Sequence, residues 1–287
     1  MAVVALVVHH ERDEATATAR RVTDWLVARG HEVRCPRLDA RIVGLEDHGV
    51  DDERLAEGLD LAVSLGGDGT ILRTVDLVST EAVPVLGVHI GQLGYLTEVE
   101  PDVLEESLER ILAGDHDVQE RMLLSVAVEA AAWPAAAPTS WLALNEAVLE
   151  KTPSGHTVRL EVWVNGRFFT TYATDGLIVA TPTGSTAYAF SARGPIVAPT
   201  HRSLQLTPVS PHMLFDRTLV LNPDDEIRLA VCGHRPATLS VDGRNLGELR
   251  AGDAVVCTGS EHRARMVTFG ERDFHSILKA KFGLEDR

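Results

Sequence analysis

The sequence predicts an α/β domain followed by a mostly β domain: an N-terminal doubly wound α/β domain and a C-terminal β-rich domain. In the first part of the chain, continuous apolar runs alternate with segments of helical periodicity, which is typical of a parallel sheet covered by helices. From about Val118 onward, short strand-like segments and turn signals replace this alternation. The chain has 287 residues, 45% of them hydrophobic, and can therefore bury a core in each of two domains.

The N-terminal domain is predicted from four apolar runs and the helices between them. Its first run is continuously apolar, as expected of a buried parallel strand, and the next segment has apolar residues at helical spacing until Gly30. A proline at the start and Gly114 after the end delimit a later helix. The predicted strands cover residues 2–8, 33–38, 59–65 and 83–88, and the predicted helices cover residues 13–29, a segment from about residue 70, and residues 101–112.

The C-terminal domain is predicted from hairpin signals. Asn165 and Gly166 form a strong turn signal between two strand-like segments. Residues 130–138 are rich in alanine and proline, have no periodic face and are predicted to form a loop. The predicted strands cover residues 157–165, 167–174, 218–221, 226–231, 238–241 and 254–258. We therefore expect domains at residues 1–117 and 118–262, with a ligand site in the cleft between them, beyond the carboxyl ends of the parallel strands.

A glycine-rich loop at residues 65–70, Leu-Gly-Gly-Asp-Gly-Thr, lies between a predicted strand and a predicted helix. Glycines let the backbone approach a phosphate closely, and the free amides at a helix start supply donors. Asp68 is unexpected there, because its charge repels a phosphate unless a cation or a reacting hydroxyl lies between them. In phosphoryl transfer, an aspartate can accept the proton of the attacking hydroxyl or hold the metal ion. The alternative is an Asp-Gly turn with a purely conformational role.

A second motif covers residues 175–188. It contains an apolar, strand-like run at 176–180, followed by the hydroxyl-rich loop Thr-Pro-Thr-Gly-Ser-Thr at 181–186. Such a density of hydroxyl groups indicates a phosphate or polyhydroxy ligand. As an alternative, Thr183 or Ser185 caps the helix that resumes after the loop. Tyr188 offers an aromatic face on which an adenine can stack, and packing against the core is the alternative.

These segments occur in an order that resembles the NAD kinase family. The order is Gly-Gly-Asp-Gly-Thr, then Val-Leu-Gly-Val-His-Ile-Gly-Gln-Leu-Gly-Tyr-Leu-Thr-Glu at 85–98, then Asn145-Glu146, then residues 175–188. The first loop alone is shared with diacylglycerol-type lipid kinases and phosphofructokinases, so residues 175–188 carry the specific resemblance. The resemblance implies transfer of the γ-phosphoryl group of ATP, or of inorganic polyphosphate, to the 2′-hydroxyl of the adenosine ribose of NAD, which gives NADP.

The resemblance also implies roles for individual residues. Asp68 corresponds to the general base or metal-linked carboxylate, and Asn145 and Glu146 correspond to contacts with the adenine and ribose parts of the dinucleotide. Asp175 corresponds to the polar edge of the nucleotide pocket. The other implied binding residues are Gly67 and Gly69 in the phosphate cradle, Thr183, Thr186, Ala187 and Tyr188 around the adenine, and Ser185 in the same dinucleotide-binding segment.

The resemblance extends to assembly and has three departures, of which one, His89 and Gln92 where asparagine and arginine are frequent, supports no inference. The resemblance implies that residues 263–287 return to the N-terminal domain and that the chain forms a homo-oligomer, a dimer or a tetramer. Arg193 stands where the family generally has a glycine, which puts the local backbone path in question. Ala173 stands where many strictly NAD-specific members have an arginine. We therefore hypothesise that NAD and NADH are both accepted.

Two alternatives share part of this pattern. A lipid kinase of the diacylglycerol type would contain the first loop, but has no reason to contain the second one. A non-catalytic dinucleotide sensor on the same scaffold, with an idle Asp68, would contain both. Formation of NADP separates the kinase from both alternatives.

The charge balance excludes nucleic acid and anionic membranes as partners. The formal net charge is −15, from 42 acidic and 27 basic side chains, and no basic cluster is present. The only lysines are Lys151, Lys279 and Lys281, and none follows a glycine, so the Gly-Lys-Ser/Thr loop of common ATPases is absent. Phosphate charge must be met by backbone amides, arginines and a divalent ion, for which Mg²⁺ or another divalent metal is the natural choice. No protein-only metal site is expected, and the pair His9-His10 is predicted to be a solvated turn.

The cysteines and the apolar segments indicate the compartment. Cys35, Cys232 and Cys257 are odd in number and widely spaced, which fits a reducing cytoplasm. No segment approaches the ~20 apolar residues of a membrane helix. We therefore expect a cytoplasmic protein.

Overall fold

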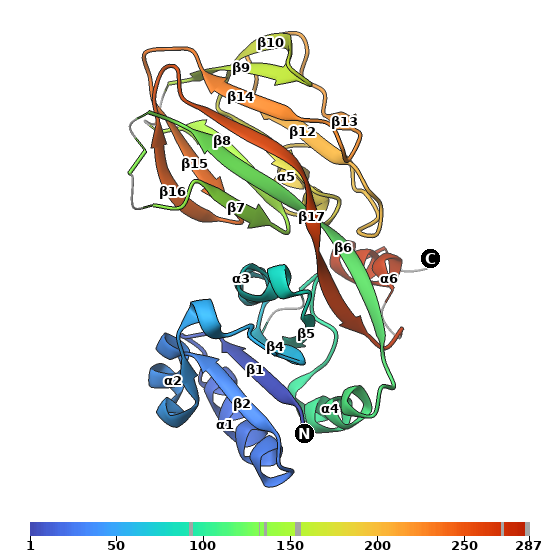
Figure 1. Ribbon diagram of the computed structural model, residues 1–287. Coiled ribbons are helices and arrows are strands. Elements are labelled where there is room, and N and C mark those ends of the chain that lie inside the picture. The colour runs from blue at the N-terminus through green and yellow to red at the C-terminus, as the bar shows by residue number, and fades with distance from the viewer. Residues whose placement is uncertain (92–93, 132, 135–136, 153–155, 271–272, 285–287) are drawn as a thin grey trace. The chain divides into compact units, whose positions relative to one another are not determined.

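The computed structural model describes residues 1–91, 94–131, 133–134, 137–152, 156–270 and 273–284 (Figure 1). The chain divides into two compact units. The first unit comprises Met1–Glu120 together with His262–Arg287, and the second unit comprises Arg121–Glu261. The chain passes between the units within strands β6 (Asp117–Glu129) and β17 (Ala254–Thr268).

The first unit contains a parallel sheet with the strand order β5-β4-β1-β2-β3. The end of β17 adds a further parallel pairing, Arg265 with Pro84 and Met266 with Val85. The strands are β1 (Val3–Val8), β2 (Glu32–Pro36), β3 (Gly49–Val50), β4 (Leu61–Gly66) and β5 (Pro84–His89). The helices are α1 (Asp13–Ala28), α2 (Arg37–Val43), α3 (Asp68–Val78), α4 (Leu104–Leu112) and α6 (Phe274–Phe282).

Both faces of this parallel sheet are covered by helices. Every residue of β4 is buried, as expected of a strand between two helical layers. Val63 of β4 belongs to a core cluster that also contains side chains of α1, α2 and α4. On the other face, a Cβ at Gly87 of β5 would lie 2.6 Å from the Cδ1 atom of Ile71 of α3. The glycine therefore lets α3 pack closely on the sheet.

The second unit consists of antiparallel strands in two sheets. One sheet has the order β10-β9-β14-β17, with β6 and β7 paired beside it, and the other has the order β13-β12-β11-β8-β15-β16. The strands, besides β6 and β17, are β7 (Ser140–Ala143), β8 (Glu146–Lys151), β9 (Val158–Val164), β10 (Arg167–Thr174), β11 (Gly176–Ala180), β12 (Leu204–Val209), β13 (Leu219–Leu221), β14 (Ile227–Val231), β15 (Ala237–Val241) and β16 (Arg244–Leu249). Its helix, α5, is the single turn Tyr188–Ser191.

The core of the second unit lies between its two sheets. Leu160 and Leu229 of the first sheet and Leu177 and Leu239 of the second belong to one buried cluster. Tyr172, which is 1% exposed, belongs to the same cluster. Strand β11, which leads directly into the second predicted loop, is part of this core.

The structure differs from the predicted elements at several boundaries. Helix α3 begins at Asp68 rather than near Thr70, because the carbonyl of Gly67 already accepts bonds from the amides of Thr70 and Ile71. Strand β17 is 15 residues long and continues to Thr268, well beyond its predicted end at 258. The predicted loop 130–138 lies partly outside the described residues, at 132 and 135–136.

In the part of the chain that the structure describes, no helix is long and apolar enough to cross a membrane.

Candidate active site

The first loop begins where the buried strand β4 ends. A Cβ at Gly66 would overlap the hydroxyl of Thr70, so the strand can turn into α3 only with a glycine at this position. Gly67 is the N-cap residue, and Asp68 is the first residue of the helix. The first turn of α3 lines one cavity with Gly67, and the helix dipole makes the region at the helix start favourable for an anion.

The Asp68 carboxylate is held by two backbone amides. Its Oδ2 accepts a hydrogen bond from the N–H of Tyr95 at 2.9 Å, and its Oδ1 accepts one from the N–H of Leu96 at 3.0 Å. A Cβ at Gly94 would overlap the carboxylate, so the loop approaches it only because this residue is a glycine. Each carboxylate oxygen retains acceptor capacity for a proton, a hydroxyl or a metal ion. Gln92 and Leu93 of the same segment lie outside the described residues.

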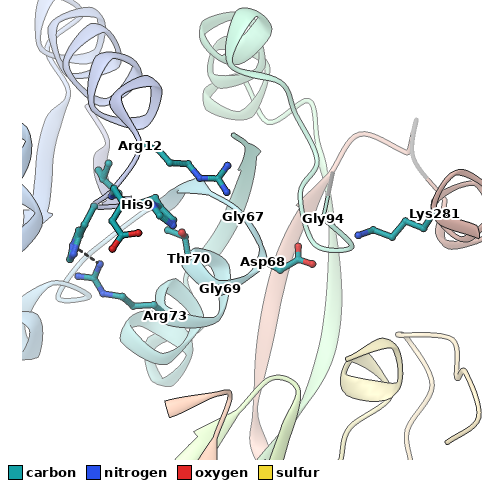
Figure 2. Close-up of a pocket in the computed structure, with 12 residues that line it drawn as sticks. His9, Arg12, Gly67, Asp68, Gly69, Thr70, Arg73, Gly94 and Lys281 are labelled. Atoms are coloured by element: carbon teal, nitrogen blue, oxygen red, sulfur yellow. Dashed lines mark hydrogen bonds between the residues drawn. The ribbon is translucent and has the colours of Figure 1, made fainter. Parts of the chain in front are cut away.

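A cavity of about 650 Å³ opens in front of Asp68 (Figure 2). No atom lies within 4 Å of a Cβ placed at Gly67 or at Gly69, so both glycines border open space. The cavity lies entirely in the first unit. Its lining comprises residues 8–12, residues 67–70, Arg73, Gly94 and Lys281.

A buried carboxylate behind this cavity orients Arg73 and His10. Asp39 is fully buried, and its oxygens accept two bonds from Arg73, at 2.6 and 3.1 Å, and one from the N–H of Val8 at 2.8 Å. The Nε2 atom of His10 lies 2.8 Å from Asp39 Oδ1. His10 lies in a turn and is exposed, as predicted, but its ring is also held by Asp39, a partner 29 residues away along the chain.

In the second unit, Asn145 and Glu146 are positioned through their backbone. The carboxylate of Asp242 accepts bonds from three successive amides, those of Leu144 at 2.7 Å, Asn145 at 2.8 Å and Glu146 at 3.0 Å. Asp242 has a φ of 47° in the turn between β15 and β16. This turn therefore fixes the start of β8, where the predicted Asn-Glu pair lies.

Glu146 is buried and its Oε2 atom has no hydrogen-bond partner. Burial raises the pKa of Glu146 to about 8, and the nearby charge of Asp242 adds to the rise. An interaction with the backbone N–H of Tyr188 partly opposes it. Burial therefore favours the protonated form of Glu146, and its Oε2 atom is buried without a hydrogen-bond partner.

The hydroxyl-rich loop that follows β11 is largely bonded to itself and to its surroundings. The hydroxyl of Thr181 donates to the carbonyl of Leu144 at 2.5 Å, and the buried hydroxyl of Ser185 bonds the backbone of Val197. A Cβ at Gly184 would overlap the backbone carbonyl of Asn145. The capping alternative is wrong, because no side chain caps the single turn at Tyr188, and Ser185 supports a neighbouring segment instead.

The residues assigned to the adenine differ in exposure and in hydrogen bonding. The buried hydroxyl of Thr183 has no hydrogen-bond partner, whereas that of Thr186 donates to the Thr183 carbonyl at 3.3 Å. Ala187 is half-buried, and Tyr188 is 38% exposed. Tyr188 is therefore not a buried core side chain, as the core-packing alternative would require, and part of it is exposed.

Asp175 forms an ion pair that the sequence did not indicate. Its Oδ1 atom lies 2.8 Å from the Nζ atom of Lys151. Burial raises the pKa of Tyr188; the charges of Glu150, Asp175 and Glu146 add to the rise, and that of Lys151 opposes it. Asp175 and Lys151 therefore lie near the Tyr188 ring, so the second unit brings these predicted residues together.

The predicted site residues thus fall into two sets. Gly67, Asp68 and Gly69 lie together in the first unit, and the remaining ones lie in the second unit around the start of β8 and the loop after β11. Sequence reasoning missed the residues that hold them. Gly94 lies inside residues 85–98, which carry part of the family resemblance, and Asp242 begins an Asp-Gly turn, but Asp39 has no local signal.

No group of three or more His, Cys, Asp or Glu side chains that could hold a metal ion occurs among the described residues. Any metal ion at Asp68 would therefore take most of its ligands from phosphate oxygens and water. A single carboxylate with hard oxygen donors fits this mode, which is common for Mg²⁺.

Comparison with known proteins places this arrangement in a family. The model of the ATP-NAD kinase N-terminal domain matches residues 4–116, and that of the ATP-NAD kinase C-terminal domain matches residues 144–269. The chain belongs to the NAD kinase family. The two matches cover the Asp68 loop and the residues 175–188, respectively.

Relatives and solved structures agree with this membership. The chain is 41% identical over 285 residues to an NAD kinase of Heliobacterium modesticaldum, with 98% of each chain covered. It is 38% identical over 283 residues to an NAD kinase of Moorella thermoacetica, with 97% of this chain and 88% of the relative covered. The fold, the family and NAD kinase activity predicted from the sequence are therefore confirmed.

Two solved structures show the same fold. A yeast NADH kinase complexed with NADH has a TM-score of 0.89 at 24% identity, over 100% of this chain and 89% of that one. An NAD kinase from Archaeoglobus fulgidus in complex with ATP has a TM-score of 0.72 at 26% identity, over 98% of this chain and 97% of that one.

Proposed function

We propose that this member of the NAD kinase family transfers the γ-phosphoryl group of ATP to the 2′-hydroxyl of the adenosine ribose of NAD, which gives NADP and ADP. The observation that carries the proposal is the Asp68 carboxylate. It is fixed by the amides of Tyr95 and Leu96 at the start of a helix, and it faces a cavity bordered by two open glycines.

In this proposal, Asp68 acts on the attacking hydroxyl. The 2′-oxygen forms a bond to the γ-phosphorus, the bond from the γ-phosphorus to the bridging oxygen breaks, and ADP leaves. The hydroxyl proton passes to the Asp68 carboxylate, which has free acceptor capacity. Gly67 and Gly69 leave room for the phosphates beside the amides of α3, so catalysis comes chiefly from positioning and from compensation of charge.

The second unit supplies the residues for the dinucleotide. We assign Asn145 and Glu146 to the adenine and ribose parts, since Asp242 holds their backbone rigidly. We assign Thr183, Thr186, Ala187 and Tyr188 to the adenine, because Tyr188 offers an exposed aromatic face. Asp175 would bind at the polar edge, together with its ion-pair partner Lys151. Ser185 supports this segment through its bonds to Val197.

A divalent ion, Mg²⁺ or another metal, belongs to the proposal. Asp68 would hold it together with phosphate oxygens and water, and the ion would balance charge on the phosphoryl group being transferred. Every other contribution described above comes from the chain itself.

Acceptance of NADH and use of polyphosphate are further parts of the proposal. Ala173 places no cation two residues before Asp175, which favours a site that does not distinguish NAD from NADH by a fixed charge. A polyphosphate donor has the same terminal phosphoryl chemistry as ATP and would need the same cradle.

We also propose a cytoplasmic homo-oligomer, a dimer or a tetramer. Strand β10 lies at the edge of its sheet and exposes Phe168 and Phe169, which are 52% and 43% exposed. Phe169 packs edge-on against Phe215, itself 37% exposed. Exposed aromatic side chains on a sheet edge are typical of an association surface. The three cysteines are free thiols, in keeping with a reducing compartment.

The experiment that tests the proposed reaction uses the purified chain with ATP, Mg²⁺ and NAD. Phosphorus NMR of the products should show a 2′-phosphate on NAD together with ADP. A lipid kinase or a non-catalytic sensor would give neither from these substrates. The same assay with NADH, and with polyphosphate in place of ATP, tests the two extensions. Undetectable phosphorylation of NADH beside rapid phosphorylation of NAD would remove the first extension.

A further inference from the structure

Three arginine and lysine side chains line the cavity in front of Asp68, and they differ in how their charge is compensated. They are Arg12, Arg73 and Lys281. Arg73 donates two hydrogen bonds to the buried carboxylate of Asp39, so its charge is largely neutralised by a permanent partner. Arg12 and Lys281 have no acidic partner among the described residues.

The contacts of Arg12 orient it without neutralising its charge. Its Nη1 atom donates to the backbone carbonyl of Ile90. Gly91, with a φ of 102°, follows, and a Cβ there would overlap the guanidinium group. The glycine therefore makes room for Arg12 a few residues before Tyr95 and Leu96, whose amides bind Asp68.

The contacts of Lys281 have the same character. Lys281 lies on α6, and its Nζ atom lies 4.3 Å from the ring centroid of Tyr95. A cation over an aromatic face is attracted to the ring but keeps its full charge. Tyr95 is also the residue whose N–H binds Asp68 Oδ2, so a single residue positions both the carboxylate and the ammonium group.

Figure 2 shows Arg12 and Lys281 extending from opposite sides toward the region of Gly67, Asp68 and Gly94. An uncompensated cation in a cavity attracts an anion, and a phosphate oxygen accepts charge-assisted hydrogen bonds from either group. The amides at the start of α3 supply only partial charges, which cannot balance a triphosphate. Arg12 on one side of Asp68 and Lys281 on the other each supply a full positive charge toward balancing the triphosphate.

We propose that Arg12 and Lys281 bind the phosphate chain of the phosphoryl donor, and that α6 thereby completes the donor site from the far end of the chain. This inference rests on the proposed function and deepens it. The donor is favoured over the dinucleotide because Gly67 and Gly69, assigned to the phosphate cradle, line the same cavity, whereas the residues assigned to the dinucleotide, apart from Asp68, lie in the second unit.

The test compares Lys281→Gln with Lys281→Arg and with a matched control, Lys279→Gln, on the same helix but outside the cavity lining. Steady-state kinetics give KM separately for ATP and for NAD, and calorimetry gives Kd for inorganic tripolyphosphate. Lys281→Gln should raise KM for ATP and Kd for tripolyphosphate about tenfold, which is the loss of one charge-assisted contact. Lys281→Arg should restore most of the binding, and Lys279→Gln should stay within about twofold of the unsubstituted chain.

Arg12→Gln should act in the same direction as Lys281→Gln, and its thermal unfolding midpoint is measured because Arg12 also holds the loop at Ile90. If Arg12→Gln does not fold, the Lys281 series decides alone. Changes within about twofold for Lys281→Gln in both assays would overturn the proposal, as would a rise in KM for NAD with KM for ATP unchanged. If the unsubstituted chain forms no NADP, the proposed function fails, but tripolyphosphate binding by the same variants still decides this inference.

Discussion

The two loops that identify the chain have the same strand–loop–helix order, but their glycines and hydroxyls lie in opposite environments. Each follows a fully buried strand, β4 or β11, and each leads into a helical segment. In the first loop, Gly67 and Gly69 border open space, and the helix amides face a cavity. In the second loop, Gly184 packs against the backbone of Asn145, and the hydroxyls of Thr181 and Ser185 are bonded within the unit.

This contrast separates the roles of the two sets of small residues. Glycines that border open space leave room for a phosphate. A glycine packed against backbone, together with hydroxyls that are bonded within the unit, instead fixes the conformation of the loop. In the proposed mechanism, the first loop takes part in phosphoryl transfer, and the second loop supplies Tyr188 to the dinucleotide beside Asn145 and Glu146 at the start of β8. Substitutions should affect turnover in the first loop and stability or dinucleotide binding in the second.

The strongest effect should come from Asp68→Asn. The amide keeps the size of the side chain but cannot take the proton of the hydroxyl, so turnover should fall at least about 100-fold. The Kd for NAD, measured by calorimetry, should change far less. Turnover within about threefold of the unsubstituted chain, under ~1 kcal/mol of barrier, would show that the base or metal role is wrong.

The next strongest effect should come from the packed glycine. Gly184→Ala should lower the free energy of unfolding by about 2–3 kcal/mol, because the added Cβ overlaps the Asn145 carbonyl and the loop must shift. Gly67→Ala is the matched control: its Cβ meets open space and its φ of −100° suits alanine. Its free energy of unfolding should fall by no more than about 1 kcal/mol in urea titrations, the cost of alanine in place of glycine at an N-cap. Equal losses in the two variants would remove the distinction between the loops.

The buried carboxyl of Glu146 predicts a pH dependence of stability. Its pKa is raised to about 8 in the folded chain, so between its usual value of 4.5 and about 8 the folded state holds a proton that the unfolded chain releases. The contribution of Glu146 to the free energy of unfolding is therefore fully present below pH 4.5, and it is lost as the pH rises from there to about 8.

Glu146→Gln removes this titration while keeping a neutral polar side chain. Relative to the unsubstituted chain, the variant should gain about 2–4 kcal/mol of unfolding free energy between about pH 5 and about pH 8. Urea unfolding of both chains across this range measures the difference. A constant difference at every pH would show that Glu146 is not buried in its neutral form.

A smaller effect is expected at the exposed end of the second loop. Tyr188→Ala removes the aromatic face and should raise KM for NAD about tenfold with little change in kcat, since stacking contributes about 1–2 kcal/mol. Tyr172→Phe, in the core of the same unit, serves as a control that leaves this face intact. An unchanged KM for NAD in Tyr188→Ala would show that the adenine does not stack on Tyr188.

The weakest effect is expected at Arg193, which has a φ of 67°, in the left-handed region. Glycine adopts this region without strain, whereas in this chain an arginine adopts it. Arg193→Gly should raise the free energy of unfolding by about 0.5–1 kcal/mol. Ala192→Gly, at an ordinary φ of −84°, should lower it instead. A decrease in both variants would contradict the explanation.

The sequence allowed prediction of what is local. The strand–loop–helix pattern around Asp68, the Asn165-Gly166 hairpin and the residues 175–188 are read from neighbouring residues. Asp39 and Asp242 were not predicted, because each acts on groups about 30 or about 100 positions away, at a distance that no periodicity records. Ser185 was assigned to the ligand by its position in a motif, but its bonding to Val197 depends on how a later segment folds back.

Tertiary context also decided the boundaries. The helix start moved to Asp68 because of the hydrogen bonds of one carbonyl, that of Gly67. Strand β17 continues to Thr268 because it pairs with β14 near its start and with β5 near its end, and neither partner is visible from its own residues.

In the proposed mechanism, catalysis depends on the Asp68 carboxylate acting on the 2′-hydroxyl of a bound dinucleotide. A crystal structure of the unsubstituted chain with NAD measures this directly, as the distance between the Asp68 carboxylate and the 2′-oxygen of the adenosine ribose. We predict a distance of about 2.6–3.2 Å, or one bridging water or metal ion between the two groups. A ribose bound many ångströms from Asp68, with the carboxylate still held by Tyr95 and Leu96, would contradict this mechanism.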